Sequence, residues 1–340
     1  MYTISQQEPK PYSDANLFIF NGLHIAPIGL KLGIYTLLQT SQLVEPLHTM
    51  PPTRLQLAKT QLTTFFDQGD KVVFSRQDLR VLMSQNRTVW HLARSTTVQD
   101  FISFLIKETQ LKEVTLKSKN YVLPARFTWG DVSPHRLALS VRKAGYLSHA
   151  TALRVHALTT QTSNTVYVNF EQSAKTNSAG LTQESIDRAF ANRQRRTSYV
   201  FAYRGAEIAI LSGKQTGRLG VIQKQNSIGE IVDVTNVERT LIDIVVRPEY
   251  SGGVQNVLDA YRLARSTTSV DALLAILKGL DYIYPYHQAI GFYFQRAGFD
   301  KSIWKRLKQR AFQFDFYLAH GISDRIYNAE WRLYYPGHLQ

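Results

Sequence analysis

Three carboxylates that lie near one another in the chain could support hydrolytic chemistry. Glu238, Asp243 and Glu249, with Arg239 among them, are the residue types that a nuclease uses to hold a divalent metal and activate water. Glu238 and Asp243 are five residues apart on a predicted helix, however, which turns their side chains about 140° away from each other. Arg239 precedes Asp243 by four residues, a spacing that suits an ion pair. The pattern therefore favours structural roles for Glu238, Arg239 and Asp243, and a nuclease is the less favoured alternative.

Histidines offer a second possible chemistry, which is metal binding. His149 and His156 are seven residues apart and share one face of a predicted helix at 148–157. Paired ligands on a helix usually stand four residues apart and need a third ligand nearby, and the sequence offers none. The chain also has no cysteine, no phosphate-binding glycine loop and no serine-hydrolase motif. We therefore expect packing histidines, no metal, no cofactor and no enzymatic activity.

Polar and basic side chains in the N-terminal third suit a different task, which is contact with DNA. Gln99, Ser103 and Lys107 recur every four residues and form one exposed stripe on a predicted helix. Asp100 and Glu108 on the same helix would repel phosphate, which argues against this interpretation. The predicted DNA-contacting residues are Arg76, Arg94, Thr96, Thr97, Gln99, Ser103, Lys107, Lys117 and Lys119.

The elements around these residues form a recognisable order. Apolar periodicity predicts a first helix at 55–66, a short strand at 72–74, a second helix from 76 and a third at 98–106. The second and third helices each begin at a predicted capping box, formed by Ser75 with Asp78 and by Thr97 with Asp100.

Two further runs, at 111–116 and 120–123, predict a hairpin with Lys117 and Lys119 at its tip. Helix, strand, two helices and a hairpin are typical of a winged helix, whose third helix enters the major groove. The loop between the second and third helices, about 11 residues long, exceeds the usual tight turn.

Length and charge agree with this interpretation. A chain of 340 residues predicts two domains, and the formal net charge of +14 favours a polyanionic partner. Residues 54–126 carry 12 Lys and Arg against 6 Asp and Glu, the highest basic density in the chain. We expect an N-terminal extension at 1–52, a winged-helix domain at 53–130 and a mixed α+β domain at 131–340. An apolar stretch at 17–38 is interrupted by polar residues, so we expect a cytoplasmic protein without a membrane partner.

Two basic runs in the C-terminal part leave an alternative open. Each could contact nucleic acid, although a basic run is more often a solvated face. The first contains Arg193, Arg195 and Arg196, and the second contains Lys301, Lys305, Arg306, Lys308 and Arg310.

Four stretches of the C-terminal part resemble AbiEi-type antitoxins, which are bacterial transcriptional regulators of the type IV toxin–antitoxin, or abortive-infection, class. The most specific stretch is TNVERTLID at 235–243, in which Thr235 and Glu238 have the spacing of a capping box. Ala157 stands where the family usually has Gly after the motif histidine, which is His156 here. The other matching stretches are 146–153 followed by His156, 284–293 and 314–318.

The resemblance implies a DNA-binding repressor and antitoxin. Such a protein would bind double-stranded DNA at the operator of its own operon and counter a nucleotidyltransferase-like toxin, without forming a stable complex with it. His149, His156, Glu238, Arg239 and Asp243 would then belong to a structural family motif. A stand-alone winged-helix regulator without a toxin partner remains the alternative.

Overall fold

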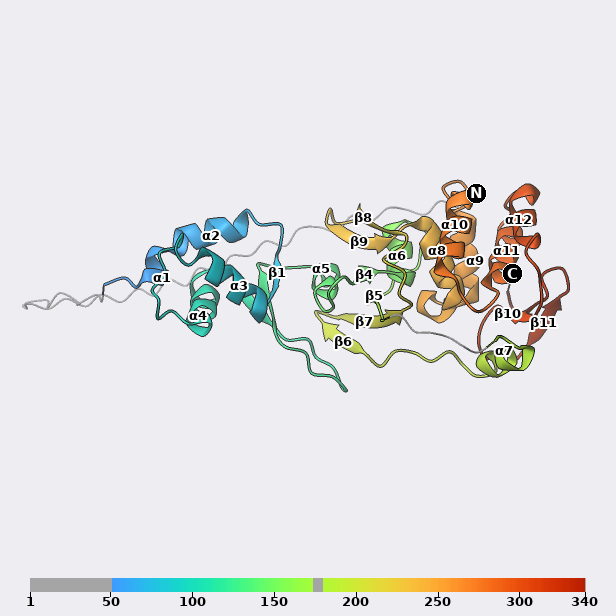
Figure 1. Cartoon of the computed structure of the whole chain (residues 1–340), viewed down its shortest axis with the longest axis horizontal. Coiled ribbons are helices and arrows are strands. Elements are labelled where there is room, and N and C mark those ends of the chain that lie inside the picture. Colours follow the sequence, from blue (N-terminus) through green and yellow to red (C-terminus); the bar gives the residue numbers. More distant parts are fainter. Residues whose placement is uncertain (1–50, 174–179, 340) are drawn as a thin grey trace, which may run out of the picture. The chain divides into compact units, whose positions relative to one another are not determined.

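A computed structural model describes residues 51–173 and 180–339 of the chain (Figure 1). The expected extension at 1–52 therefore lies almost wholly outside the described residues, as does the apolar stretch at 17–38. Within the two described ranges, none of the helices has both the length and the apolar character needed to cross a membrane.

Four helices and three short strands make up the beginning of the described chain. Helices α1 (Arg54–Leu57) and α2 (Lys59–Asp67) are followed by strand β1 (Val73–Ser75), helix α3 (Arg76–Asn86) and helix α4 (Val98–Glu108). Strands β2 (Leu111–Val114) and β3 (Arg126–Trp129) complete an antiparallel sheet in the order β1-β3-β2. Both predicted capping boxes are confirmed: Ser75 caps α3 with Asp78, and Thr97 caps α4 with Asp100.

An aromatic core joins these helices to their sheet. Phe66 of α2 stacks on Trp129 of β3 with 4.7 Å between ring centroids, and Trp90 stacks on Phe101 of α4 at 5.8 Å. Leu62, Leu79, Phe101 and Leu105 are fully buried in the same cluster. Burial of apolar surface on this scale is what holds short helices in place, because each of them would be marginal alone.

The predicted hairpin differs from the one observed. Its second strand is β3, whereas the expected strand at 120–123 is part of a connection at residues 115–125, here called the β2–β3 loop. Lys117 in this loop forms an isolated antiparallel bridge with Ala202, and the Tyr121 ring meets the Tyr199 ring edge-on at 4.6 Å. Residues 120–123 are therefore not a strand of the small sheet, and Tyr121 contacts Tyr199 instead.

A six-stranded mixed sheet occupies the centre of the remaining chain. Its order is β6-β7-β5-β4-β9-β8, with parallel pairing of β5 with β7 and of β4 with β9. Its strands are β4 (Tyr146–Leu147), β5 (Thr165–Glu171), β6 (Val200–Tyr203), β7 (Ala206–Gly213), β8 (Val221–Gln225) and β9 (Ile231–Thr235). Helices α5 (Pro134–Leu139) and α6 (His149–Val155) pack on this sheet, and helix α7 (Gln183–Phe190) lies between β5 and β6 in the chain.

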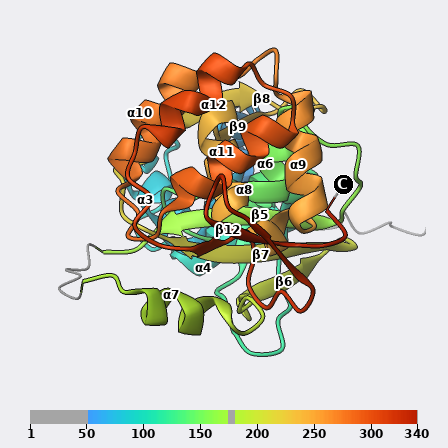
Figure 2. The same cartoon turned by 90° about the vertical axis from the view of Figure 1, so that its right-hand side faces the viewer.

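The C-terminal helices gather into one bundle, seen from two sides in Figures 1 and 2. They are α8 (Val237–Val246), α9 (Val254–Leu263), α10 (Val270–Leu280), α11 (Tyr286–Arg296) and α12 (Lys301–Lys308), with a 3-10 turn, η1 (Pro248–Ser251), after α8. A small sheet in the order β10-β12-β11 closes the described chain: β10 (Phe316–Tyr317), β11 (Arg325–Asn328) and β12 (Leu333–Pro336). The sequence predicted the helices but not this sheet.

The fold is thus of the mixed α+β class. Pro51–Gln340 forms one compact unit, and the apolar cluster under the six-stranded sheet also takes in Val73 and Leu116 from the N-terminal elements. The domain boundary expected at 130/131 stays a prediction.

Candidate nucleic-acid interface

Helix α4 presents the predicted polar stripe to solvent. Phe101, Ile102 and Leu105 are buried on one side of the helix, and this burial fixes which side remains outside. Gln99, Ser103 and Lys107 are all exposed, and the Gln99 amide donates to the Ser103 hydroxyl at 3.1 Å. A base contact by Gln99 would replace this exposed hydrogen bond, which is a small loss because its net contribution is only about 1 kcal/mol.

Two of the predicted contact residues are already engaged at the start of this helix. The Thr97 hydroxyl donates to Asp100 at 2.6 Å and accepts from the Asp100 backbone N–H at 3.1 Å. These hydrogen bonds from Thr97 lower the pKa of the Asp100 carboxyl. Thr97 is therefore a capping residue first, whereas its neighbour Thr96 is half-buried.

The long loop before α4 is held by a residue that the sequence analysis missed. The Arg87 guanidinium donates to the carbonyl oxygens of Ala93 at 2.5 Å and Thr96 at 2.9 Å. One side chain thus satisfies acceptors along much of the loop and positions Arg94, which is exposed on it. No periodicity or motif marks Arg87, because its partners are backbone carbonyls that any residue could supply.

Several acidic groups in this region have hydrogen-bond or ion-pair partners. Glu108, which was expected to repel phosphate, forms an ion pair with Lys59 at 3.1 Å. Asp67 accepts hydrogen bonds from the Trp129 indole at 2.7 Å and from the Gln110 amide at 2.8 Å. The Asp78 carboxylate serves the α3 cap and pairs with Lys71 at 2.8 Å.

Several cations, by contrast, remain exposed and form no ion pair within residues 51–173 and 180–339. Exposed positive charges without ion-pair partners make the local electrostatic potential more positive, and this potential attracts an anionic ligand. These cations are Arg54, Arg76, Arg80, Arg94, Lys107, Lys117 and Lys119.

Lys117 and Lys119 do not lie at the tip of a free hairpin as predicted. The Lys117 backbone exchanges two hydrogen bonds with Ala202 of β6, at 2.8 and 3.4 Å, and the Tyr121 hydroxyl lies 3.0 Å from that of Ser198. Both lysine side chains are nevertheless exposed. They are available to phosphate on a loop that is fixed at its backbone.

The motif at 235–243 forms a buried helix start whose capping differs from the prediction. Asn236, and not Thr235, caps α8 by accepting from the Arg239 N–H at 2.8 Å. Glu238 instead accepts from the backbone N–H of Ser269 at 2.8 Å, at the start of α10. The expected capping box of Thr235 with Glu238 is therefore wrong, because Thr235 is the last residue of β9 and its hydroxyl bonds to Thr240.

The three carboxylates considered for nuclease chemistry have separate partners. Asp243 forms a buried ion pair with Arg239, 2.8 Å from Nε to Oδ1, as the spacing predicted. Glu249 pairs with Arg196 at 2.8 Å on the surface. Among the described residues, no group of three or more His, Asp or Glu side chains is placed to hold a metal ion.

The two motif histidines lie at opposite ends of α6. His149, the first helical residue, is buried with its Nδ1 2.9 Å from the Ser148 hydroxyl, and burial holds the pKa of His149 well below its usual value. Its backbone φ of 51° is a left-handed conformation that costs free energy for a residue other than Gly. His156 contacts the Thr235 carbonyl at 2.6 Å through Nε2. The His156 contact connects the end of α6 to β9.

Comparison with known proteins adds a similarity of fold. The structure aligns with the crystal structure of the Rv2827c protein from Mycobacterium tuberculosis at a TM-score of 0.51, covering 84% of this chain and 93% of that chain. The sequences are 14% identical over the alignment. The likeness is one of fold. No family model and no curated protein matches the chain.

The basic runs of the C-terminal part are partly neutralised. On α12, Arg306 pairs with Asp271 at 2.6 Å, and Lys308 pairs with Glu330. Arg196 pairs with Glu249, as noted above. The density of free positive charge is thus lower here than the sequence alone indicates, which leaves the region around α4 as the better candidate.

Proposed function

We propose that residues 53–130 form a winged helix that binds double-stranded DNA, with α4 in the major groove. The observation that carries the proposal is the exposed stripe of Gln99, Ser103 and Lys107 on a helix that is capped at its start and buried along its other face. The order of helix, strand, two helices and two strands agrees with this arrangement. Side-chain amides of this kind can bond adenine through two atoms in the major groove.

The charge distribution supports the same proposal. Arg76 at the start of α3, Arg94 before α4, and Lys117 and Lys119 on the β2–β3 loop are exposed without ion-pair partners in the described part of the chain. Phosphate contacts from such residues fix the position of a protein on the duplex but carry no base information. Specificity would then come from α4.

We further propose that the chain is a transcriptional repressor and the antitoxin of a type IV toxin–antitoxin system. The support is the resemblance of the 146–156, 235–243, 284–293 and 314–318 stretches to AbiEi-type antitoxins. In that role it binds the operator of its own operon and counters a nucleotidyltransferase-like toxin without a stable complex.

The DNA-binding proposal is tested with the full chain and two labelled duplexes, one from the region upstream of its own reading frame and one of scrambled sequence. Replacing Gln99 with Ala should weaken binding to the first duplex by roughly 1 to 3 kcal/mol and leave the second nearly unchanged. Gln61→Ala, at an exposed position of α2, is the matched control. Equal affinity of the wild-type chain for both duplexes, or an unchanged ratio in Gln99→Ala, would overturn the assignment of α4.

The antitoxin proposal is tested separately, by co-expression with the product of the neighbouring reading frame. Rescue of growth by the wild-type chain supports an antitoxin. If operator binding is present but no neighbouring product is toxic or rescued, the chain is a stand-alone regulator.

A further inference from the structure

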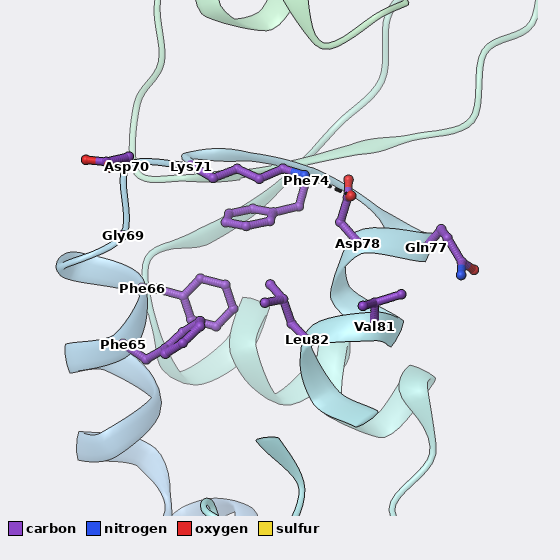
Figure 3. A pocket seen from close by; sticks show the side chains of 10 residues that line it. All are labelled: Phe65, Phe66, Gly69, Asp70, Lys71, Phe74, Gln77, Asp78, Val81 and Leu82. Atoms are coloured by element: carbon purple, nitrogen blue, oxygen red, sulfur yellow. Dashed lines mark ion pairs between the residues drawn. The ribbon is translucent and has the colours of Figure 1, made fainter. Parts of the chain in front are cut away.

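An apolar cavity of about 320 Å³ lies between helices α2 and α3, beneath β1. Figure 3 shows Phe66, Phe74 and Leu82 pointing into the space between the two helices, whereas Asp70 and Gln77 point away from it. Phe65 and Val81 stand at its edge, and they are among the more exposed large apolar residues of the chain, at 38% and 40%. The cavity therefore exposes apolar surface that neither helix covers.

Three aromatic rings form part of the wall. The Phe66 and Phe74 rings meet edge-on with 5.3 Å between centroids, and Phe65 meets Phe66 edge-on at 5.5 Å. Phe66 and Phe74 are nearly fully buried, at 2% and 3%, so Phe65, at 38%, is the ring that is open to a further ring. A ligand ring there would gain the edge-to-face and offset contacts that aromatic pairs prefer.

Of the three charged residues that line the cavity, Lys71 and Asp78 pair with each other and Asp70 points away from it. Lys71 pairs with Asp78 at 2.8 Å, as the dashed line in Figure 3 marks. The second Asp78 oxygen is held by the Ser75 N–H and hydroxyl, both at 2.7 Å. A charged ligand would have to displace part of this network or enter without a partner, and burying an unpaired charge is costly. The pair thus offers a charged ligand no unpaired partner.

Its volume sets the size of an occupant. A protein cavity of about 150 Å³ accommodates benzene, and ligand pockets begin at about 300 Å³. A space of about 320 Å³ fits a fused two-ring aromatic. We propose that this cavity is a binding site for a small, uncharged aromatic molecule. The site is separate from the exposed face of α4, and the proposal does not depend on DNA binding.

Two of the four tryptophans report directly on this site. Trp90 meets Phe65 edge-on at 5.2 Å, and Trp129 stacks on Phe66 at 4.7 Å, so each touches a ring of the cavity wall. Trp304 and Trp331 belong to the separate C-terminal cluster. The full chain is therefore labelled with 5-fluorotryptophan and titrated with indole, and the four fluorine resonances are assigned by single Trp→Phe variants.

We expect the Trp90 and Trp129 resonances to shift saturably, with a Kd of about 1 mM or tighter, and those of Trp304 and Trp331 to stay in place. An absence of saturable shifts, or shifts confined to Trp304 and Trp331, overturns the proposal. Tighter binding of indole-3-acetate than of indole at the same resonances overturns the preference for an uncharged ligand.

Filling the cavity provides the second test. Val81→Phe adds a ring at the exposed edge and should weaken indole binding at least tenfold, whereas Ile231→Phe, at an exposed position of β9, should leave it unchanged. The dispersion of the unliganded fluorine spectrum shows whether each variant is folded. Unaltered indole affinity in folded Val81→Phe places the ligand elsewhere and overturns the site.

Discussion

The Arg87 guanidinium donates a hydrogen bond of 2.9 Å to the carbonyl oxygen of Thr96, the residue just before the N-cap of α4. Arg87 is also the C-cap of α3. The residue that ends one helix thus fixes the point at which the next begins, across a loop that is long for this arrangement.

Replacing Arg87 with Ala should loosen the start of α4. Hydrogen bonds from a charged donor contribute about 1.5 to 3 kcal/mol, so we expect a loss of this order in the free energy of unfolding, measured with urea. Operator affinity should fall with it. Arg80→Ala, at an exposed position of α3, is the control and should change stability by less than about 0.5 kcal/mol. Equal stability of the two variants would contradict the role given to Arg87.

Exchanging Lys117 and Lys119 together for Ala tests phosphate contact by the β2–β3 loop. Each phosphate contact contributes roughly one unit to the slope of log affinity against log salt, so the slope should fall by about two for operator and scrambled DNA alike. The affinity ratio between the two duplexes should not change. Lys301→Ala with Lys305→Ala, on exposed positions of α12, is the matched pair. A larger effect of the α12 pair would move the phosphate contacts to the C-terminal part.

The sequence correctly predicted the capping boxes that form through contacts within one helical turn. Ser75 with Asp78 and Thr97 with Asp100 form their capping boxes because both partners lie within one turn. Thr235 and Glu238 have the same spacing, yet Glu238 bonds to Ser269, 31 residues away. Packing between α8 and α10 decides that outcome, and a single-sequence pattern does not contain it.

The same distinction between local and long-range contacts holds for the candidate site. The stripe of Gln99, Ser103 and Lys107 follows from helical periodicity, and all three are exposed as expected. The anchoring of Lys117 to Ala202 and the reach of Arg87 depend on backbone atoms brought together by the fold. Side-chain types alone carry no signal of such contacts.

His287 gives the fold a dependence on pH. Burial, with a smaller effect of nearby Arg310, lowers the pKa of His287 to about 4, and its Nε2 has no hydrogen-bond partner among the described residues. The unfolded chain takes up this proton near pH 6.5 and the folded chain only near pH 4, so proton binding favours the unfolded chain between these values. The free energy of unfolding is therefore highest above pH 6.5 and falls as the pH drops toward 4.

The variant His287→Phe should therefore lose less stability than the wild-type chain between pH 7 and pH 4, by up to about 3 kcal/mol. Urea unfolding at a series of pH values measures the difference. His338→Phe, at an exposed position, controls for the loss of an imidazole. Parallel pH profiles for wild type and His287→Phe would show that the partly buried ring does not titrate as described.

Asp243→Asn separates a structural role from a catalytic one. The change leaves the Arg239 guanidinium buried without its counter-ion, and breaking a buried pair in this way costs about 3 to 5 kcal/mol. Glu249→Gln removes an exposed pair with Arg196 and should cost less than about 1 kcal/mol. Neither variant should cleave DNA. Magnesium- or manganese-dependent cleavage by the wild-type chain that disappears in folded Asp243→Asn would point to a nuclease instead.

The bridge between Lys117 and Ala202 bears on the order in which the chain folds during synthesis. The aromatic core around Phe66, Phe101 and Trp129 is complete once residue 129 has left the ribosome, so the N-terminal helices can pack on their own sheet at that stage. The partners of the β2–β3 loop, at 198–203, follow about 70 residues later, and closing so long a segment is slower than local packing. Leu116 shares its apolar cluster with Phe201 and Tyr203 of β6, so its packing is incomplete until β6 has been made, and a chaperone or a protease would meet this loop in that interval.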